Sequence, residues 1–186
     1  MKKRCAWVSN DPLYIEYHDT EWGVPVFDDE TLFEFLVLES FQAGLSWITI
    51  LKKRENFRQA FNGFDYQKIA RYTDDKLIEL FENTGIVRNK LKIKATVTNA
   101  QSFIKVQEEF GSFSTYIWSF VDGKPIKNAF ETREEVPATT ELSDKISKDL
   151  KKRGFKFVGS TIVYAFMQAV GIVNDHTADC FRYNEV

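Results

Sequence analysis

Apolar residues recur at helical spacing along most of the chain, and turn residues separate the periodic segments. A stripe of Leu32, Phe35 and Leu36 predicts a helix that begins near Glu30. The same reasoning predicts helices over residues 45–61, 65–72, 73–84, 88–110, 114–121, 143–153 and 160–170. No hairpin turn joins two strand-like runs and residues 126–138 resemble a loop, so we expect an all-α fold.

The composition fits one globular domain, which we place at residues 1–186. Aromatic residues make up 15% of the chain, more than a core of this size usually needs, so we expect some rings to line a pocket. No stretch approaches the roughly 20 apolar residues of a membrane span. The basic N-terminus is not followed by the apolar segment of a secretory leader, and we therefore expect a cytoplasmic protein.

The charged residues are unevenly distributed. A net charge of −2 argues against a general nucleic-acid binder. However, residues 87–107 carry five basic residues and no acidic one, and residues 52–54 and 151–153 are basic triplets. Any one of these clusters is typical of a solvated helix face. Together they indicate a basic face on an otherwise acidic molecule.

The only two cysteines and two histidines lie at opposite ends of the chain. Cys5 and His18 are near its start, and His176 and Cys180 are near its end. They form a complete Cys2His2 set, which a closed structural zinc site requires. Spacing alone also allows unconnected cysteines or a Cys5–Cys180 disulfide. A zinc ion with four protein ligands has no open position for water, so it would be structural and not catalytic.

Glu39 occupies an unusual position in the predicted helix. It follows Phe35 by four residues and Leu36 by three, so it lies on the apolar stripe. A carboxylate drawn into an apolar interior is costly unless it is paired. Such a residue is a functional candidate, although a structural glutamate bonded to a capping amide would show the same pattern.

Large aromatic residues are concentrated in the segments that contain His18 and Glu39. They are Trp7, Tyr14, Tyr17, Trp22 and Trp47. Aromatic faces together with one carboxylate can hold a flipped-out nucleic-acid base, by stacking and by hydrogen bonding to its polar edge. A hydrophobic core built from rings is the alternative for each residue taken singly.

Gly154 and Gly159 separate the last two predicted long helices. Two glycines allow a tight turn and a close approach to the main chain, and the free N–H groups of the following helix attract anions. Lys151, Lys152 and Arg153 lie alongside, so phosphate is the expected ligand. The Lys-Ser/Thr pair of a nucleotide P-loop is missing, and a clamp on a DNA phosphate fits better. A structural helix–helix turn would look the same.

Short motifs along nearly the whole chain carry a family resemblance. They are Trp7-Val-Ser, Asp11-Pro-Leu-Tyr, Tyr17-His-Asp, Glu21-Trp-Gly-Val-Pro, Gln42-Ala-Gly-Leu-Ser-Trp, Leu51-Lys-Lys-Arg-Glu-Asn, Lys151-Lys-Arg-Gly-Phe-Lys-Phe-Val-Gly and Val173-Asn-Asp-His. Together these motifs resemble the 3-methyladenine DNA glycosylase I family of the helix-hairpin-helix superfamily. The resemblance implies base-excision repair by hydrolysis of the N-glycosidic bond of 3-methyladenine, with alkylated double-stranded DNA as partner and a monomeric enzyme.

The resemblance also implies roles for individual residues. Cys5, His18, His176 and Cys180 would bind one structural zinc ion, and residues 151–159 would form the DNA-gripping hairpin. In the base pocket it implies that Glu39 and Tyr17 bind the adenine edge, Trp47 stacks on the base, and Trp7, Tyr14 and Gln42 contribute further contacts.

The family has no equivalent of the catalytic Asp found in many members of the superfamily. Asp175 lies in roughly the right region, but it adjoins a zinc ligand and we do not assign it this role. Methylation at N3 makes the base cationic and a good leaving group, so general-acid catalysis is less necessary. We therefore expect Glu39 to supply lesion selectivity and charge stabilisation more than proton transfer.

Two other functions are compatible with parts of the pattern. A non-catalytic, zinc-stabilised DNA-binding module would use the same hairpin, but it would not need Glu39 beside Tyr17 and Trp47. A metal-dependent hydrolase would need an open zinc position, which a Cys2His2 set does not offer.

Overall fold

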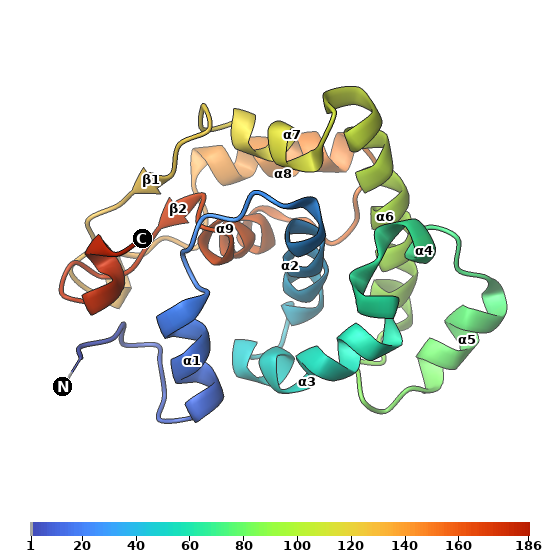
Figure 1. The fold of residues 1–186 in the computed structure, drawn as a ribbon, viewed down its shortest axis with the longest axis horizontal. Helices are drawn as coiled ribbons and strands as arrows, with labels where there is room; N and C mark the ends of the chain where they lie inside the picture. The colour runs from blue at the N-terminus through green and yellow to red at the C-terminus, as the bar shows by residue number, and fades with distance from the viewer. Residues whose placement is uncertain (1) are drawn as a thin grey trace.

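The computed structural model describes residues 2–186, and these residues are mostly helical (Figure 1). The α-helices are α1 (Pro12–Thr20), α2 (Asp29–Gln42), α3 (Trp47–Ala60), α4 (Tyr66–Ile69), α5 (Asp74–Glu82), α6 (Lys90–Phe110), α7 (Phe113–Ser119), α8 (Glu141–Lys152) and α9 (Ser160–Ala169). Single 3-10 turns are η1 (Asn62–Phe64), η2 (Arg133–Glu135) and η3 (Phe181–Asn184). The predicted helices are confirmed, with ends shifted by up to three residues.

Helix α8 shows why some of these ends moved. It begins two residues earlier than expected, because Thr140 and Ser143 form a reciprocal capping box. The Thr140 side chain accepts from the Ser143 N–H at 3.1 Å, and the Ser143 hydroxyl accepts from the Thr140 N–H at 2.8 Å.

Two short strands depart from the all-α expectation. The strands β1 (Ile126–Lys127) and β2 (Val173–Asn174) pair in parallel, with Ile126 opposite Val173. The Ile126 N–H donates to the Ile172 carbonyl at 2.9 Å. The pair joins segments far apart in the chain, so no local turn signal could have revealed it. It fastens part of the predicted loop to the segment that carries His176.

Helix α2 is the centre of the molecule, surrounded by other helices in Figure 1. It packs against α3, α6, α7 and α9. Every residue from Leu32 to Phe41 except Glu34 is buried. The predicted apolar stripe therefore understates the burial of this helix, because neighbours cover it on almost all sides. Glu39 is buried with the rest.

The two ends of the chain lie on the same side of the molecule (Figure 1). The Phe181 N–H donates to the Lys3 carbonyl at 2.9 Å, which joins the last 3-10 turn to the N-terminal segment. No helix within residues 2–186 is long and apolar enough to cross a membrane.

Candidate active site

A cavity of about 340 Å³ opens between both chain ends, α1, α2, α3, α9 and the loop that contains η2. Every base-pocket residue expected from the sequence lies in its wall: Glu39, Tyr17, Trp47, Trp7, Tyr14 and Gln42. These residues come from the N-terminal segment and three different helices. The fold therefore brings together the side chains that the motifs singled out.

Aromatic rings form two groups in this wall. The Trp7 ring lies 5.0 Å from the rings of both Tyr14 and Trp22, between centroids. The Tyr17 and Trp47 rings are 5.5 Å apart. These tilted and edge-on contacts hold the rings in fixed orientations in a cavity wall that an aromatic ligand could pack against.

Unsatisfied polar atoms are concentrated in the same cavity. Among residues 2–186, five buried side-chain nitrogen or oxygen atoms have no hydrogen-bond partner. Four of them belong to lining residues: Glu39 Oε2, the Tyr17 hydroxyl, and the indole nitrogens of Trp7 and Trp47. A buried polar group without a partner costs about 1–3 kcal/mol, so such groups are rare. This arrangement favours a ligand with a polar edge.

The charge state of Glu39 depends on what occupies the cavity. Burial raises the pKa of its carboxyl group to about 8. Burial also raises the pKa of the Tyr17 hydroxyl well above its usual value, and the negative charge of Glu39 adds to this effect. At neutral pH, this raised pKa keeps Glu39 mostly protonated. A positively charged ligand beside it would favour the ionised form.

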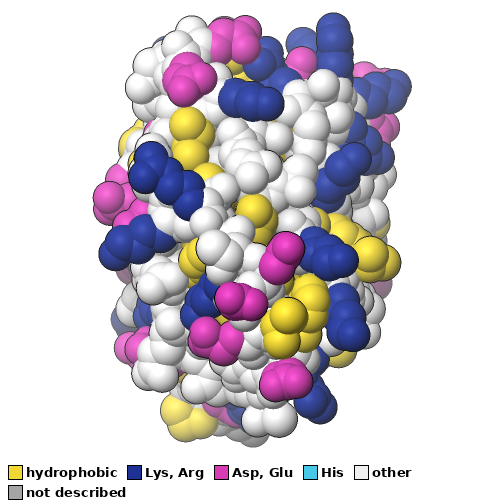
Figure 2. Space-filling model, turned by 90° about the vertical axis from the view of Figure 1, so that its right-hand side faces the viewer, with side chains coloured by type: hydrophobic (Ala, Val, Ile, Leu, Met, Phe, Trp, Pro, Cys, Tyr) yellow, Lys and Arg dark blue, Asp and Glu magenta, His cyan; other side chains and the backbone are white. Residues whose placement is uncertain are grey.

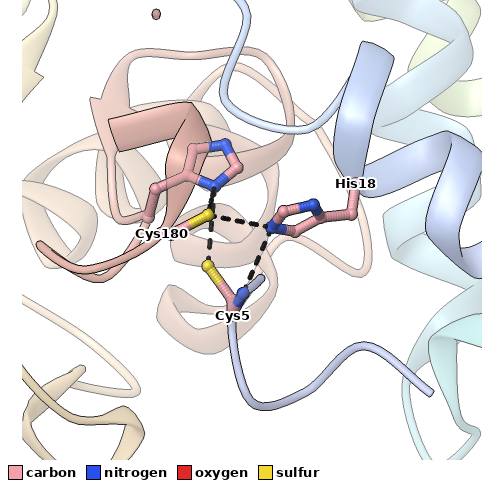
Figure 3. Close-up of side chains that lie close together, drawn as sticks. Cys5, His18 and Cys180 are labelled. Carbon is pink, nitrogen blue, oxygen red and sulfur yellow. Dashed lines mark hydrogen bonds between the residues drawn. The ribbon is translucent and has the colours of Figure 1, made fainter. Parts of the chain in front are cut away.

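The four cysteine and histidine residues meet in one buried cluster. Figure 3 shows Cys5, His18 and Cys180 of this cluster pointing toward one another. Cys180 Sγ lies 3.4 Å from His18 Nε2 and 3.5 Å from His176 Nδ1, and Cys5 Sγ also lies 3.5 Å from His176 Nδ1. Tetrahedral zinc with its usual bond lengths places sulfur and nitrogen ligands about 3.5 Å apart. The donor set and its spacing therefore fit a zinc ion.

The far side of each imidazole ring has its own hydrogen bond. His18 Nδ1 lies 2.7 Å from Asp19 Oδ1, and His176 Nε2 lies 2.9 Å from the Trp22 carbonyl oxygen. Each acceptor favours a proton on the nitrogen that faces it, which leaves the other nitrogen free to bind metal. Cys5 also lines the cavity, so this cluster supports the pocket wall directly.

The turn between α8 and α9 only partly matches the role expected for its glycines. Gly154 has φ +97°, and a Cβ there would lie 3.0 Å from Ser102 Oγ, so this position requires glycine. Gly159 has φ −60° and caps α9, and a Cβ there would meet nothing within 4 Å. The second positive φ, +54°, belongs to Phe157. Gly159 therefore leaves the helix start open, but it does not make the turn.

Several residues of the predicted basic face are instead used inside the molecule. Arg153 donates to Asp149 Oδ2 and to Glu109 Oε2, both at 2.7 Å. Lys92 is buried and donates to the carbonyl oxygens of Phe41 at 3.0 Å and Ala43 at 2.8 Å, which caps the end of α2. Local sequence does not reveal the Lys92 contacts, because Phe41 and Ala43 lie 51 and 49 residues away, whereas Asp149 on α8 precedes Arg153 by only four residues.

The right-hand side of the molecule in Figure 1 is not uniformly basic. Figure 2 shows Lys and Arg there interspersed with Asp and Glu. At the end of α8, however, Lys151 and Lys152 are exposed, and so is Lys156 on the turn that follows. These three lysines are available to an anionic partner.

Comparison with known proteins identifies the family. The model of the methyladenine glycosylase family matches residues 7–183. The chain belongs to the methyladenine glycosylase family. It is 50% identical over 181 residues to the DNA-3-methyladenine glycosylase 1 of Escherichia coli (strain K12), covering 97% of each chain. It is 49% identical over 180 residues to the DNA-3-methyladenine glycosylase of Haemophilus influenzae, again covering 97% of each.

Solved structures of the family have the same fold. A crystal structure of 3-methyladenine DNA glycosylase I matches with a TM-score of 0.94 at 52% identity, covering 96% of this chain and 98% of that chain. The Staphylococcus aureus glycosylase, whose structural basis of 3-methyladenine recognition has been described, matches with a TM-score of 0.93 at 40% identity and covers 96% and 95%. The resemblance stated from the motifs is confirmed.

The pocket of this family member also contains residues that the sequence did not single out. They are Ala6, Arg133, Val136, Pro137, Ala165, Gln168 and Thr177. Asp175 lines the pocket as well, but its carboxylate accepts hydrogen bonds from Asn128, Tyr164 and Gln168. It is therefore held as a fixed acceptor, which supports leaving it without a catalytic role. The residues that the sequence did not single out reach the cavity through tertiary packing, which no local sequence pattern reveals.

Proposed function

We propose that this protein is a DNA repair enzyme that hydrolyses the N-glycosidic bond of 3-methyladenine in alkylated duplex DNA. The observation that carries the proposal is the set of unsatisfied polar atoms in an aromatic cavity, since these atoms match the edge of a flipped-out base. Family membership supplies the identity of the base, because the relatives are named for 3-methyladenine.

In this proposal, the aromatic wall and Glu39 together select the lesion. The base stacks on Trp47, and its exocyclic amine donates to Glu39 while Tyr17 contacts the same edge. Trp7, Tyr14 and Gln42 line the remaining walls. Before its bond breaks, 3-methyladenine carries a positive charge, which electron-rich rings favour by roughly 0.5–2 kcal/mol per contact. The raised pKa of Glu39 means that its ionisation is favoured by a cation and not by ordinary adenine.

The cationic base leaves readily, so the enzyme needs little acid catalysis. The bonding electrons pass to the base, which leaves as neutral 3-methyladenine, and water adds to the sugar carbon and loses a proton to solvent. Glu39 stabilises the positive charge of the bound lesion. The chain positions the base and excludes competing ones, which explains why no residue pair for proton transfer is required.

The hairpin between α8 and α9 is proposed as a helix-hairpin-helix grip on the DNA backbone. The N-terminus of α9 presents free N–H groups, and Gly159 leaves them uncovered. Lys151 and Lys152 are exposed beside this turn. Arg153 contributes to the grip by holding the end of α8 in place, since its own charge is already paired.

We propose that Cys5, His18, His176 and Cys180 hold one structural zinc ion. The ion would supply folding free energy by joining the chain ends behind the pocket. One chain provides every pocket wall, so we propose that the protein acts as a monomer. We also propose that it acts in the cytoplasm.

Release of free bases from methylated duplex DNA tests the proposed function. Chromatography of the released bases should show 3-methyladenine without comparable 7-methylguanine, with no divalent metal added. A heat-unfolded sample serves as the control for spontaneous depurination. Binding of the DNA without base release would overturn the proposal and favour the non-catalytic DNA-binding module.

A further inference from the structure

The η2 turn places one positive charge at the mouth of the pocket. Arg133 is exposed and is the only Lys or Arg among the residues that line the cavity. Its neighbours Val136 and Pro137 lie in the same wall, and the Val136 N–H donates to the Arg133 carbonyl at 3.2 Å. The turn is thus part of the pocket and not a detached loop.

The guanidinium group of Arg133 is free to bind a ligand. Within residues 2–186, its side chain takes part in no hydrogen bond or ion pair, whereas Arg54, Arg153 and Arg182 all pair with carboxylates. The nearby Glu135 carboxylate instead accepts from the Glu131 N–H at 2.7 Å. In the part of the chain that the structure describes, it forms no ion pair with Arg133.

The positive charge of Arg133 acts on the pocket wall. Burial raises the pKa of the Tyr14 hydroxyl, and the Arg133 charge opposes part of this rise. Tyr14 is an aromatic residue of the pocket wall. Arg133 lines the same pocket as Tyr14, so it lies beside a ligand that enters through the mouth.

The charge of Arg133 is the wrong sign for the proposed base. A cationic base is repelled by a guanidinium group, and the pocket already offers Glu39 to that base. The other part of a flipped nucleotide is its sugar-phosphate backbone, which stays at the mouth and is negatively charged. Arginine matches the geometry of a phosphate with two parallel N–H donors.

We infer that Arg133 binds a backbone phosphate next to the flipped nucleotide. This inference rests on the proposed function, since it requires a nucleotide in the pocket. The contact comes from η2, so it is a second anchor on the DNA that is separate from the hairpin between α8 and α9. It holds the DNA without entering into the recognition of the base.

Arg133→Gln and Arg133→Lys test this role, with Arg71→Gln as the matched control. Arg71 is also exposed but lies outside the pocket, between α4 and α5. For each protein, kcat and KM for 3-methyladenine release from duplex DNA are measured from 50 to 200 mM salt. Affinity for free 3-methyladenine is measured separately, by quenching of pocket tryptophan fluorescence.

The inference predicts a higher KM for Arg133→Gln, by about 3.5-fold or more at 50 mM salt, with kcat unchanged. The slope of log KM against log salt should fall by about 0.9, so the difference from the unchanged protein shrinks about 3.5-fold by 200 mM. Affinity for the free base should stay the same or improve. The KM of Arg133→Lys should lie between those of the unchanged protein and Arg133→Gln, because lysine keeps the charge and loses the two-donor geometry.

Three negative outcomes are distinguishable. If the unchanged protein releases 3-methyladenine and Arg133→Gln has the KM and salt slope of Arg71→Gln, the inference is wrong and the proposed function stands. If the unchanged protein releases no base, the proposed function fails and the inference fails with it. A lower affinity of Arg133→Gln for the free base would also overturn the inference, because it would place Arg133 in base recognition.

Discussion

Asn99 on α6 and Lys156 on the turn between α8 and α9 exchange two hydrogen bonds. The Asn99 amide donates to the Lys156 carbonyl at 3.0 Å, and the Lys156 N–H donates to Asn99 Oδ1 at 2.7 Å. The next residue, Phe157, has φ +54°, a conformation that non-glycine residues rarely adopt. The carbonyl of Val158 accepts from the Ser147 hydroxyl at 2.6 Å. Buried side chains on α6 and α8 thus hold the proposed DNA-binding turn in a strained conformation.

Asn99→Leu should loosen this turn without changing the base pocket. The variant leaves the Lys156 N–H and carbonyl without their partners, so we expect a loss of about 1–3 kcal/mol in the free energy of unfolding. DNA affinity should fall, while affinity for free 3-methyladenine should stay unchanged. Gln101→Met is the control, because Gln101 lies on the same helix but donates to the Ala70 carbonyl. Equal losses of DNA and free-base affinity in Asn99→Leu would contradict this account.

Glu39 should make the stability of the protein depend on pH. Its folded pKa of about 8 lies above the usual 4.5, so between these values the folded chain keeps a proton that the unfolded chain has lost. Stability therefore falls as pH rises through this window. Relative to Glu39→Gln, the unfolding free energy of the unchanged protein should fall by about 3 kcal/mol from pH 5 to pH 8. Urea unfolding of both proteins at both pH values measures this difference. The same change in unfolding free energy in the two proteins would show that Glu39 is not buried as described.

The two cations Lys151 and Arg153 should behave differently, although they are close in sequence. Arg153→Gln breaks ion pairs with Asp149 and Glu109, so we expect a loss of about 1 kcal/mol in stability. Lys151→Gln should leave stability unchanged and reduce the salt dependence of DNA binding by about one phosphate contact. Thermal unfolding and DNA titrations at several salt concentrations separate the two effects. The reverse pattern would mean that Arg153 leaves its partners to bind DNA.

The proposed zinc site should depend on Asp19, which bonds the far nitrogen of His18. Loss of such a partner typically weakens metal binding by about 10–100-fold. Asp19→Ala should therefore lose zinc at lower chelator concentrations than the unchanged protein, as measured by metal analysis after dialysis. Removal of zinc should also lower the unfolding temperature. Glu185→Gln is the control, because Glu185 pairs with Arg182 near the site but contacts no proposed ligand. Unchanged zinc retention in Asp19→Ala would argue against the site.

The sequence predicted best those residues whose type alone is informative. The Cys and His residues could be grouped because there are only four of them, and Glu39 was visible because a carboxylate interrupts an apolar stripe. Lys92 could not be interpreted in this way, because its partners Phe41 and Ala43 are about fifty residues away. The sequence did not predict Arg133 as a pocket residue, because it lines the pocket only once η2 has packed there. Local patterns thus identified the chemistry, and tertiary packing decided which charged residues are free.

The most direct test of the pocket's proposed role is the ratio of two excision rates on one substrate. Release of 3-methyladenine and 7-methylguanine from the same methylated duplex is followed for the unchanged protein and for Glu39→Gln. The account predicts that the unchanged protein strongly prefers 3-methyladenine and that Glu39→Gln loses much of this preference, because its rate for 3-methyladenine falls. The same ratio and the same rates in both proteins would contradict the assignment of lesion selectivity to Glu39.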